Sequence, residues 1–301
     1  MSASGVTAEI LRRDLREFAR LAESRYDPGV VDAVLAALDG VWGDSWLAVR
    51  TTTHPPPARQ VSVRFMNLPA SADPVGRLRA AGLLDFAGHP MEQLVSADVP
   101  VDWGVDVAID RGVQKIWLVF QDLIEVDRIL GFPGMPASAR AHAEQLRRWS
   151  DGEFALLALD FLNRTMNLYA QILPPGRLGA ADIADILREL DFVAADEDEL
   201  AALGRPYTVY ATFAWNSPRV QRICFPARYT AETFPAIDPV LSRFVDGAPC
   251  AGPGPHGFAF YAAYGASGRY YKVQADYTSP LSHALPGGAD LPGGIDLSQN
   301  R

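Results

Sequence analysis

The stretch GVQKIWLVF, Gly112 to Phe120, decides the fold, because all but one of its features are typical of a buried β-strand. The exception is Lys115, which stands among aliphatic and aromatic side chains. A buried ammonium group must be paired, or its pKa must shift, because removing a charge from water is costly. The stretch therefore predicts a strand whose lysine has a specific partner or task.

This strand is one of a series of strand pairs, which are joined by turns and separated by helical segments. The expected pairs are 44–50 with 59–66, 102–110 with 112–120, 153–161 with 165–172, 207–215 with 219–227, and 258–265 with 269–276. Helical periodicity covers 7–25, 29–41, 74–84, 122–131, 137–150, 180–191 and 238–245. Tight turns join antiparallel neighbours, and closing such a sheet removes its edges. We therefore expect an α+β fold in a single domain, 1–278: a ten-stranded antiparallel β-barrel built from about five αββα repeats, with helices surrounding the barrel.

The middle of each second strand carries a polar residue at a recurring position: Arg64, Lys115, Asn167, Arg222 and Lys272, at intervals of 51, 52, 55 and 50 residues. Four of these five residues are cations, and no acidic residue stands at the equivalent positions. In a closed barrel such side chains converge on the lumen and require an anion from outside, for which a diphosphate is the natural candidate. The alternative is that each is an exposed residue on the outer face of its strand.

The two lysines support a chemical role for these positions. Of the 27 basic residues, only Lys115 and Lys272 are lysine, and all the others are arginine. Arginine and lysine are not interchangeable where a compact ammonium group is needed. Both lysines are therefore expected to be required for their chemistry.

The overall composition argues against several classes of protein. The chain of 301 residues is 49% hydrophobic and has a formal net charge of −9, which disfavours nucleic-acid and membrane-surface partners. No apolar run reaches membrane length, and the first residues contain no apolar signal core. We expect a soluble cytoplasmic protein, in the monomeric state, whose two cysteines form no metal motif. Residues 279–301 are rich in Pro and Gly, which indicates a tail after the barrel.

Six segments in order along the chain resemble a known family. They are GLLDFAGHPMEQL, VQKIWLVF, LDFLNRTMNLY, ILREL, YTVYATFAWNSPRVQRICF and RYYKVQADY. Together they are similar to the soluble aromatic prenyltransferases of the αββα (ABBA) barrel type, over roughly residues 8–278. The resemblance implies catalysis in the lumen of a ten-stranded barrel. It also implies prenylation of naphthalenes, hydroxybenzoates, phenazines or related aromatics in bacterial secondary metabolism.

The resemblance also implies roles for individual residues. An allylic diphosphate, with dimethylallyl diphosphate as the expected donor, would be bound by Arg50, Arg64, Lys115, Asn167, Tyr169, Tyr210, Arg222 and Lys272. Four of these would assist departure of the diphosphate as catalytic residues: Lys115, Tyr210, Arg222 and Lys272. Trp117 would stabilise the allylic cation, with ordinary packing as the alternative.

The same comparison predicts a reaction without magnesium. Ser62 stands where magnesium-dependent members of the family carry an aspartate, and Mg²⁺ prefers carboxylate and phosphate oxygens. The expected reaction is therefore an electrophilic aromatic substitution with no metal and no cofactor, in which protein cations neutralise the leaving group.

The acceptor side is expected at Leu156, Tyr207, Gln274 and Asp276, which match variable positions of the family. For Asp276 an ion pair with Lys272 is an alternative, and such a pair would weaken the diphosphate prediction. A different functional class also stays open: a non-catalytic barrel that binds an anionic aromatic metabolite.

Overall fold

The computed structural model describes residues 5–174, 176–252 and 257–278, and ten strands within them close a barrel. The strand order is β1-β10-β9-β8-β7-β6-β5-β4-β3-β2, and every neighbouring pair is antiparallel. The strands are β1 (Trp46–Thr52), β2 (Val61–Leu68), β3 (Val101–Ala108), β4 (Gly112–Glu125), β5 (Glu153–Asp160), β6 (Thr165–Ala170), β7 (Tyr210–Ala214), β8 (Arg222–Thr230), β9 (Gly257–Gly265) and β10 (Gly268–Asp276). The predicted fold is confirmed.

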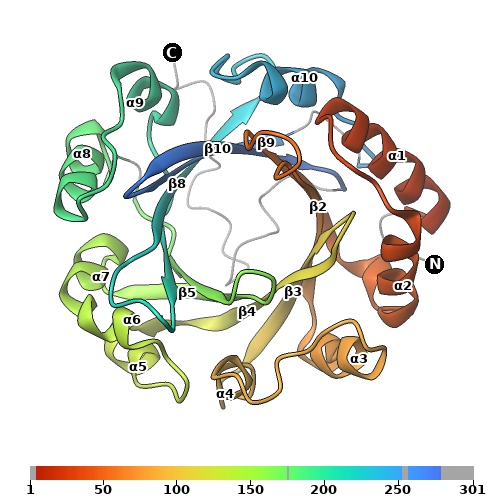
Figure 1. Cartoon of the computed structure of the whole chain (residues 1–301), viewed down its shortest axis with the longest axis horizontal. Helices are drawn as coiled ribbons and strands as arrows, with labels where there is room; N and C mark the ends of the chain where they lie inside the picture. The colour runs from red at the N-terminus through yellow and green to blue at the C-terminus, as the bar shows by residue number, and fades with distance from the viewer. Residues whose placement is uncertain (1–4, 175, 253–256, 279–301) are drawn as a thin grey trace.

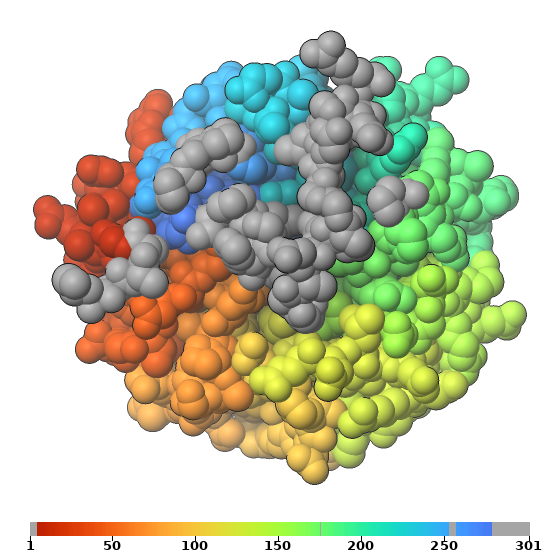
Figure 2. Space-filling model, turned by 180° about the vertical axis from the view of Figure 1, so that it is seen from behind, coloured from red at the N-terminus to blue at the C-terminus, as the bar shows by residue number. Residues whose placement is uncertain are grey.

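The helices lie in a ring outside the barrel (Figure 1), and the view from behind shows the chain passing around the molecule in sequence order (Figure 2). They are α1 (Ala8–Leu21), α2 (Pro28–Ala37), α3 (Pro74–Ala80), α4 (Met91–Val95), α5 (Val126–Leu130), α6 (Ala137–Ala141), α7 (Ala143–Ser150), α8 (Ala180–Glu189), α9 (Glu197–Leu203) and α10 (Pro239–Gly247). None of the described helices is long and apolar enough to cross a membrane.

The main hydrophobic core fills the space between the outer face of the barrel and the helices. On β1, Leu47 and Val49 belong to this core, where they pack with buried helical residues such as Phe18. Ala48 and Arg50, which alternate with them along the strand, point to the other side, because successive side chains of a strand alternate between its two faces. The inner face is therefore free to carry polar and aromatic side chains.

The register of the sheet places charged residues next to one another on this inner face. Arg64 on β2 is directly opposite Asp106 on β3, and Asp106 is opposite Lys115 on β4. Lys115 is in turn opposite Asp160 on β5. Directly opposed residues of antiparallel strands project to the same face, so cations and carboxylates alternate around this part of the wall.

Several boundaries differ from the expectations. The segment 122–131 was expected to be helical throughout, but β4 continues to Glu125 before α5 begins. The segment 137–150 forms two helices, α6 and α7, which are separated at His142.

Cys224 and Cys250 are both free. The predicted tail, 279–301, lies outside the described residues.

Candidate active site

The structure brings the predicted diphosphate-binding residues together on the inner face of the barrel. Pairings across the sheet join Arg50 to Gln274, Asn167 to Thr212 and Tyr169 to Tyr210, and these pairs share one face. Arg222 is opposite Thr212, and Lys272 is opposite Tyr261. The alternative of unrelated residues on the outer face therefore does not apply. The binding roles themselves stay predictions.

No acidic residue stands at the recurring positions of the second strands, but the first strands place carboxylates opposite two of these cations, Arg64 and Lys115, so the inferred need for an anion from outside does not hold for them. Asp106 is fully buried and lies between two arginines. Its Oδ2 is 3.2 Å from Nη2 of Arg50 and 3.5 Å from Nε of Arg64. These two predicted diphosphate ligands thus already have a negative neighbour in the protein.

Lys115, the residue that the strand pattern singles out, is also paired. Its Nζ is 3.0 Å from Oδ2 of Asp160, and both side chains are almost completely buried. Asn163 donates to Asp160 from its backbone N–H at 2.9 Å and from its side-chain amide at 3.0 and 3.1 Å. Burial disfavours ionisation of Asp160, but the positive charge of Lys115 and the hydrogen bonds from Asn163 outweigh it, so the pKa of Asp160 is lowered.

Lys272 and Arg222 have a different environment, made of tyrosines. Nζ of Lys272 donates to Oη of Tyr210 at 2.6 Å and lies 5.3 Å from the centre of the Tyr270 ring. The Arg222 guanidinium lies 5.6 Å from the centre of the same ring. Within the part of the chain that the structure describes, neither cation lies within 4.0 Å of a carboxylate oxygen.

This environment changes the ionisation of Lys272. Burial lowers its pKa well below the usual value, and the nearby positive charge of Arg222 lowers it further. Burial also raises the pKa of Tyr210 well above its usual value, so this tyrosine keeps its proton and remains a hydrogen-bond donor at neutral pH. An entering anion would favour the protonated form of Lys272.

Asn167 and Tyr169 continue the polar wall beside Tyr210. The side-chain amide of Asn167 donates to Oη of Tyr169 at 3.2 Å, and the Tyr169 and Tyr210 rings stack with their centres 4.3 Å apart. The carbonyl oxygen of the Asn167 side chain is buried and has no hydrogen-bond partner among the described residues. This group of side chains offers polar atoms and aromatic faces to one space.

A cavity of about 90 Å³ opens further along the lumen, and aromatic side chains form much of its wall. It is lined by Trp46, Arg64, Met66, Trp117, Ala155, Leu156, Tyr169, Ala170, Ile172, Tyr207, Thr208, Tyr210, Pro226, Tyr261 and Gln274. Three predicted acceptor residues, Leu156, Tyr207 and Gln274, are therefore at this cavity. A mostly apolar cavity with a few polar groups suits an aromatic ligand.

Arg64 lies between the charged part of the lumen and this cavity. Its guanidinium is 4.9 Å from the centre of the Trp117 ring, and its Nη1 donates to Oε1 of Gln274. Gln274 also accepts from Oη of Tyr261 at 3.2 Å. The indole of Trp117, predicted to stabilise an allylic cation, thus already has a cation close to its ring.

Asp276 does not pair with Lys272, and the alternative that would weaken the diphosphate prediction is not found. Its Oδ2 instead accepts from Nη2 of Arg228, the inward-facing residue of β8 beyond Pro226. A Cβ on Gly257 would lie 2.5 Å from Oδ2 of Asp276 and 2.8 Å from Nη2 of Arg228, so a glycine makes room for this ion pair. Sequence reasoning missed Arg228.

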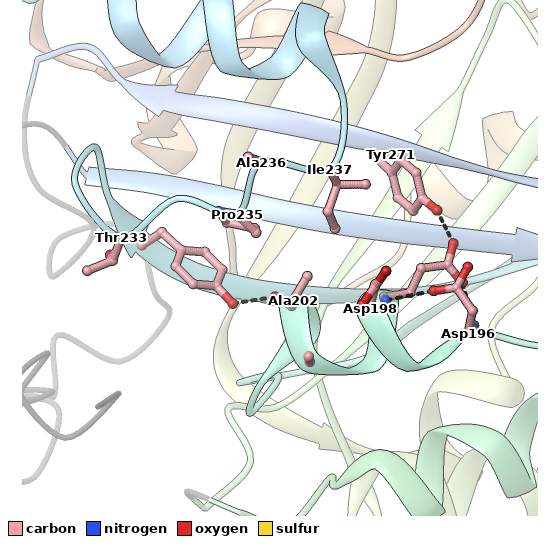
Figure 3. A pocket seen from close by; sticks show the side chains of 11 residues that line it. Asp196, Asp198, Ala202, Thr233, Pro235, Ala236, Ile237 and Tyr271 are labelled. Atoms are coloured by element: carbon pink, nitrogen blue, oxygen red, sulfur yellow. Dashed lines mark hydrogen bonds between the residues drawn. The ribbon is translucent and has the colours of Figure 1, made fainter.

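A second pocket, of about 630 Å³, lies outside the barrel between α9 and the segment that follows β8 (Figure 3). Its acidic residues include Asp196 and Glu199, which are paired with Arg269 at 2.8 and 2.5 Å. Tyr271 donates to Glu199 from the outer face of β10. The larger pocket is therefore separate from the predicted site residues.

Sequence reasoning also missed Asp106 and Asp160, although their strand context was visible in the sequence. Asp106 in DWGVDVAID and Asp160 in EFALLALD each stand in a run typical of a strand, as Lys115 does. Only the register across the sheet shows that they face the cations of the second strands. Because that register depends on pairing between strands, alternation within one strand could not show it.

Comparison with known proteins agrees with this geometry. Residues 6–288 match the family described as Aromatic prenyltransferase Orf2. A flaviolin linalyltransferase of Streptomyces virginiae is 30% identical over 258 residues, which are 81% of this chain and 83% of the relative. A 4-hydroxyphenylpyruvate 3-dimethylallyltransferase of Streptomyces niveus is 28% identical over 290 residues, which are 93% and 87% of the two chains.

A solved structure also has the same fold. The 5-dimethylallyl tryptophan synthase from Streptomyces coelicolor, in complex with DMASPP and Trp, superposes with a TM-score of 0.53 at 15% identity. The match covers 90% of this chain and 95% of that one. The closed barrel, the lumen and these matches lead to one conclusion: the chain belongs to the Orf2 family and is an aromatic prenyltransferase with the ABBA fold.

Proposed function

We propose that this enzyme transfers a dimethylallyl group from dimethylallyl diphosphate to an aromatic small molecule by electrophilic substitution, without a metal ion. The observation that carries the proposal is the pair Arg222 and Lys272, two cations on the inner face with tyrosines rather than carboxylates beside them. Positive charge of this kind stabilises a departing diphosphate more than the bound donor.

The reaction follows from this arrangement. The bond between the allylic carbon and the diphosphate oxygen breaks, and its electron pair leaves with the diphosphate. Lys272, Arg222 and the Tyr210 hydroxyl stabilise the growing negative charge, with Arg50, Arg64 and Lys115 adding positive charge from β1, β2 and β4. A π-electron pair of the acceptor forms the new carbon–carbon bond, and the ring then loses a proton.

The tyrosine and tryptophan rings stabilise the allylic cation and exclude water from it. Tyr169 and Tyr210 stack beside the cations and also line the apolar cavity. A ring face stabilises a nearby cation by about 0.5–2 kcal/mol. The acceptor occupies the cavity near Leu156 and Tyr207.

One feature supports the metal-free form. Ser62 offers no carboxylate, and Asp106, on the neighbouring strand two residues from the position opposite Ser62, is already paired with two arginines. The names of the two relatives specify a linalyl and a dimethylallyl group, so both chain lengths belong in the test.

The test is turnover in excess EDTA, with dimethylallyl or geranyl diphosphate and a panel of phenols, naphthols, hydroxyphenylpyruvate and indoles, read by mass spectrometry. The expected product is heavier than its acceptor by one C5H8 unit. Restoration of activity only by added Mg²⁺ would contradict the metal-free reaction. Absence of dimethylallyl diphosphate binding would contradict the proposed site altogether.

A further inference from the structure

Asp106 is the most unusual buried group in the lumen. It is fully buried on β3, and neither of its carboxylate oxygens forms a hydrogen bond within the described residues. Its contacts with Arg50 and Arg64, at 3.2 and 3.5 Å, are therefore charge pairings without good hydrogen-bond geometry. A buried carboxylate with so few hydrogen bonds is costly, which makes a purely structural role a poor explanation.

Asp160, the other carboxylate of this wall, provides the contrast. It contacts a single cation, Lys115, at 3.0 Å, and receives three hydrogen bonds from Asn163. Asp160 is thus held by the protein whether or not Lys115 also contacts a ligand. Asp106 has no such support, and its two arginines are its only charged contacts among the described residues.

We propose that Asp106 is a positioning residue that acts as an internal counter-ion: it holds Arg50 and Arg64 in the lumen and competes with the diphosphate for them. The inference rests on the proposed function, because it assumes that the lumen binds a diphosphate. A bound diphosphate attracts both arginines away from Asp106. Their contacts with Asp106 form again when pyrophosphate leaves.

The charges of the lumen show why such a residue is useful. Among the residues that the structure describes, six cations face the lumen (Arg50, Arg64, Lys115, Arg222, Arg228 and Lys272), with three carboxylates beside them (Asp106, Asp160 and Asp276). Without Asp106 two arginines would add their full charge to that of Lys272 and Arg222. Because substrate and product share the same diphosphate group, binding both more tightly slows product release without accelerating the chemical step.

The experiment measures the affinity of inorganic pyrophosphate by calorimetry in EDTA, for the wild type and Asp106→Asn. Removing one negative charge beside two arginines should make pyrophosphate bind about tenfold more tightly. A residue with a merely structural role would give the opposite result, since its loss would disorder the arginines and weaken binding. Thermal melting monitored by circular dichroism checks that the variant is folded.

The matched control is Asp276→Asn, which removes another buried carboxylate that is paired with an arginine. Asp276 is four residues from Lys272 along β10, a separation of roughly 13 Å in a strand. Its removal should change pyrophosphate affinity much less. An equal gain in both variants would overturn the specific role of Asp106, because it would report only the total charge of the lumen.

Ser62→Asp gives a second test that does not remove a buried counter-ion. Ser62 is opposite Arg50 in the sheet, and its hydroxyl is buried without a hydrogen-bond partner among the described residues. An added carboxylate there should weaken pyrophosphate binding about tenfold in EDTA. If Asp106→Asn does not fold, unchanged binding by Ser62→Asp still overturns the inference, because a carboxylate beside Arg50 would then not compete with pyrophosphate.

The outcomes separate the inference from the proposed function. Wild-type binding of pyrophosphate, tighter binding by Asp106→Asn and weaker binding by Ser62→Asp support both. Wild-type binding with unchanged or weaker binding by Asp106→Asn, or with unchanged binding by Ser62→Asp, overturns the inference and leaves the function in place. If neither the wild type nor Asp106→Asn binds pyrophosphate, the proposed diphosphate site itself is wrong, and the inference falls with it.

Discussion

The two sides of the lumen hold the predicted diphosphate-binding cations in opposite ways, whereas Arg228, which was not predicted to bind the diphosphate, is paired with Asp276. On the carboxylate-paired wall, formed by β1 to β5, Arg50, Arg64 and Lys115 contact Asp106 or Asp160. On the tyrosine-paired wall, formed by β7 to β10, Arg222 and Lys272 lie against tyrosine rings and a hydroxyl. A carboxylate neutralises a cation, whereas a phenol leaves its charge in place. The difference places the charge available to a ligand mainly on the tyrosine-paired wall.

Removing Lys115 tests the carboxylate-paired wall and should have the largest effect. Lys115→Gln leaves Asp160 buried without its cation, and breaking such a pair costs about 3–5 kcal/mol of unfolding free energy. Denaturant unfolding measures this loss. The control is the double variant Lys115→Gln/Asp160→Asn, in which no charge is left alone and most of the stability should return. Equal stability of Lys115→Gln and the wild type would mean that the two walls do not differ in this respect.

Removing Lys272 tests the tyrosine-paired wall. Lys272→Gln leaves no carboxylate uncompensated, so the unfolding free energy should not fall, while kcat should drop by about 10²–10³ because a charge that stabilises the leaving group is lost. Steady-state turnover with dimethylallyl diphosphate measures the effect, and the same unfolding assay provides the control. A variant that loses stability but keeps its turnover would assign Lys272 to the structure rather than to catalysis.

These two variants also show how far the sequence could lead. The rhythm of paired strands was enough to predict the barrel, and the recurring polar positions were enough to predict that Lys115 and Lys272 face one lumen. The sequence could not show that one lysine is neutralised and the other is not. That distinction depends on Asp160 across the sheet, and a register is set by pairing between strands.

The partners of the predicted acceptor residues could not be predicted for the same reason, because they lie on other strands. Asp276 was correctly placed on the inner face, but its partner is Arg228, a residue that no motif of the family resemblance included. Helix boundaries such as the start of α5 failed for a different reason. Leu123 and Ile124 near the end of β4 fit a helix and a strand equally well, and the pairing of Ile124 and Glu125 with β5 extends the strand.

The pH dependence of binding separates the two walls further. Burial lowers the pKa of Lys272, the nearby positive charge of Arg222 adds to this lowering, and a bound anion raises the pKa again. Pyrophosphate binding should therefore take up a proton between these two pKa values. Affinity should fall as pH rises through that window, by up to about tenfold per pH unit for one proton.

Calorimetry in buffers of different ionisation enthalpy counts this proton. The control is Lys272→Gln, which keeps the titration of pyrophosphate itself and the neighbours Arg222 and Tyr210, but lacks the lysine. The uptake that belongs to Lys272 is the difference between the two proteins. The same uptake in both would show that Lys272 is already protonated in the empty lumen, and the contrast between the walls would then rest on pairing alone.

The smallest expected effect concerns the hydroxyl that distinguishes the tyrosine-paired wall from a purely aromatic one. Tyr210→Phe keeps the ring that stacks on Tyr169 and removes only the oxygen that Lys272 contacts at 2.6 Å. A hydrogen bond to a charged group contributes about 1.5–3 kcal/mol, and water that enters the site replaces part of it, so kcat/KM for dimethylallyl diphosphate should fall by about tenfold. The matched control is Tyr264→Phe, since Tyr264 is a fully buried residue of β9 whose hydroxyl has no hydrogen-bond partner among the described residues. Its turnover should equal that of the wild type. If Tyr210→Phe also equals the wild type, the ring alone orients Lys272, and the tyrosine-paired wall acts through its aromatic faces rather than through its hydroxyls.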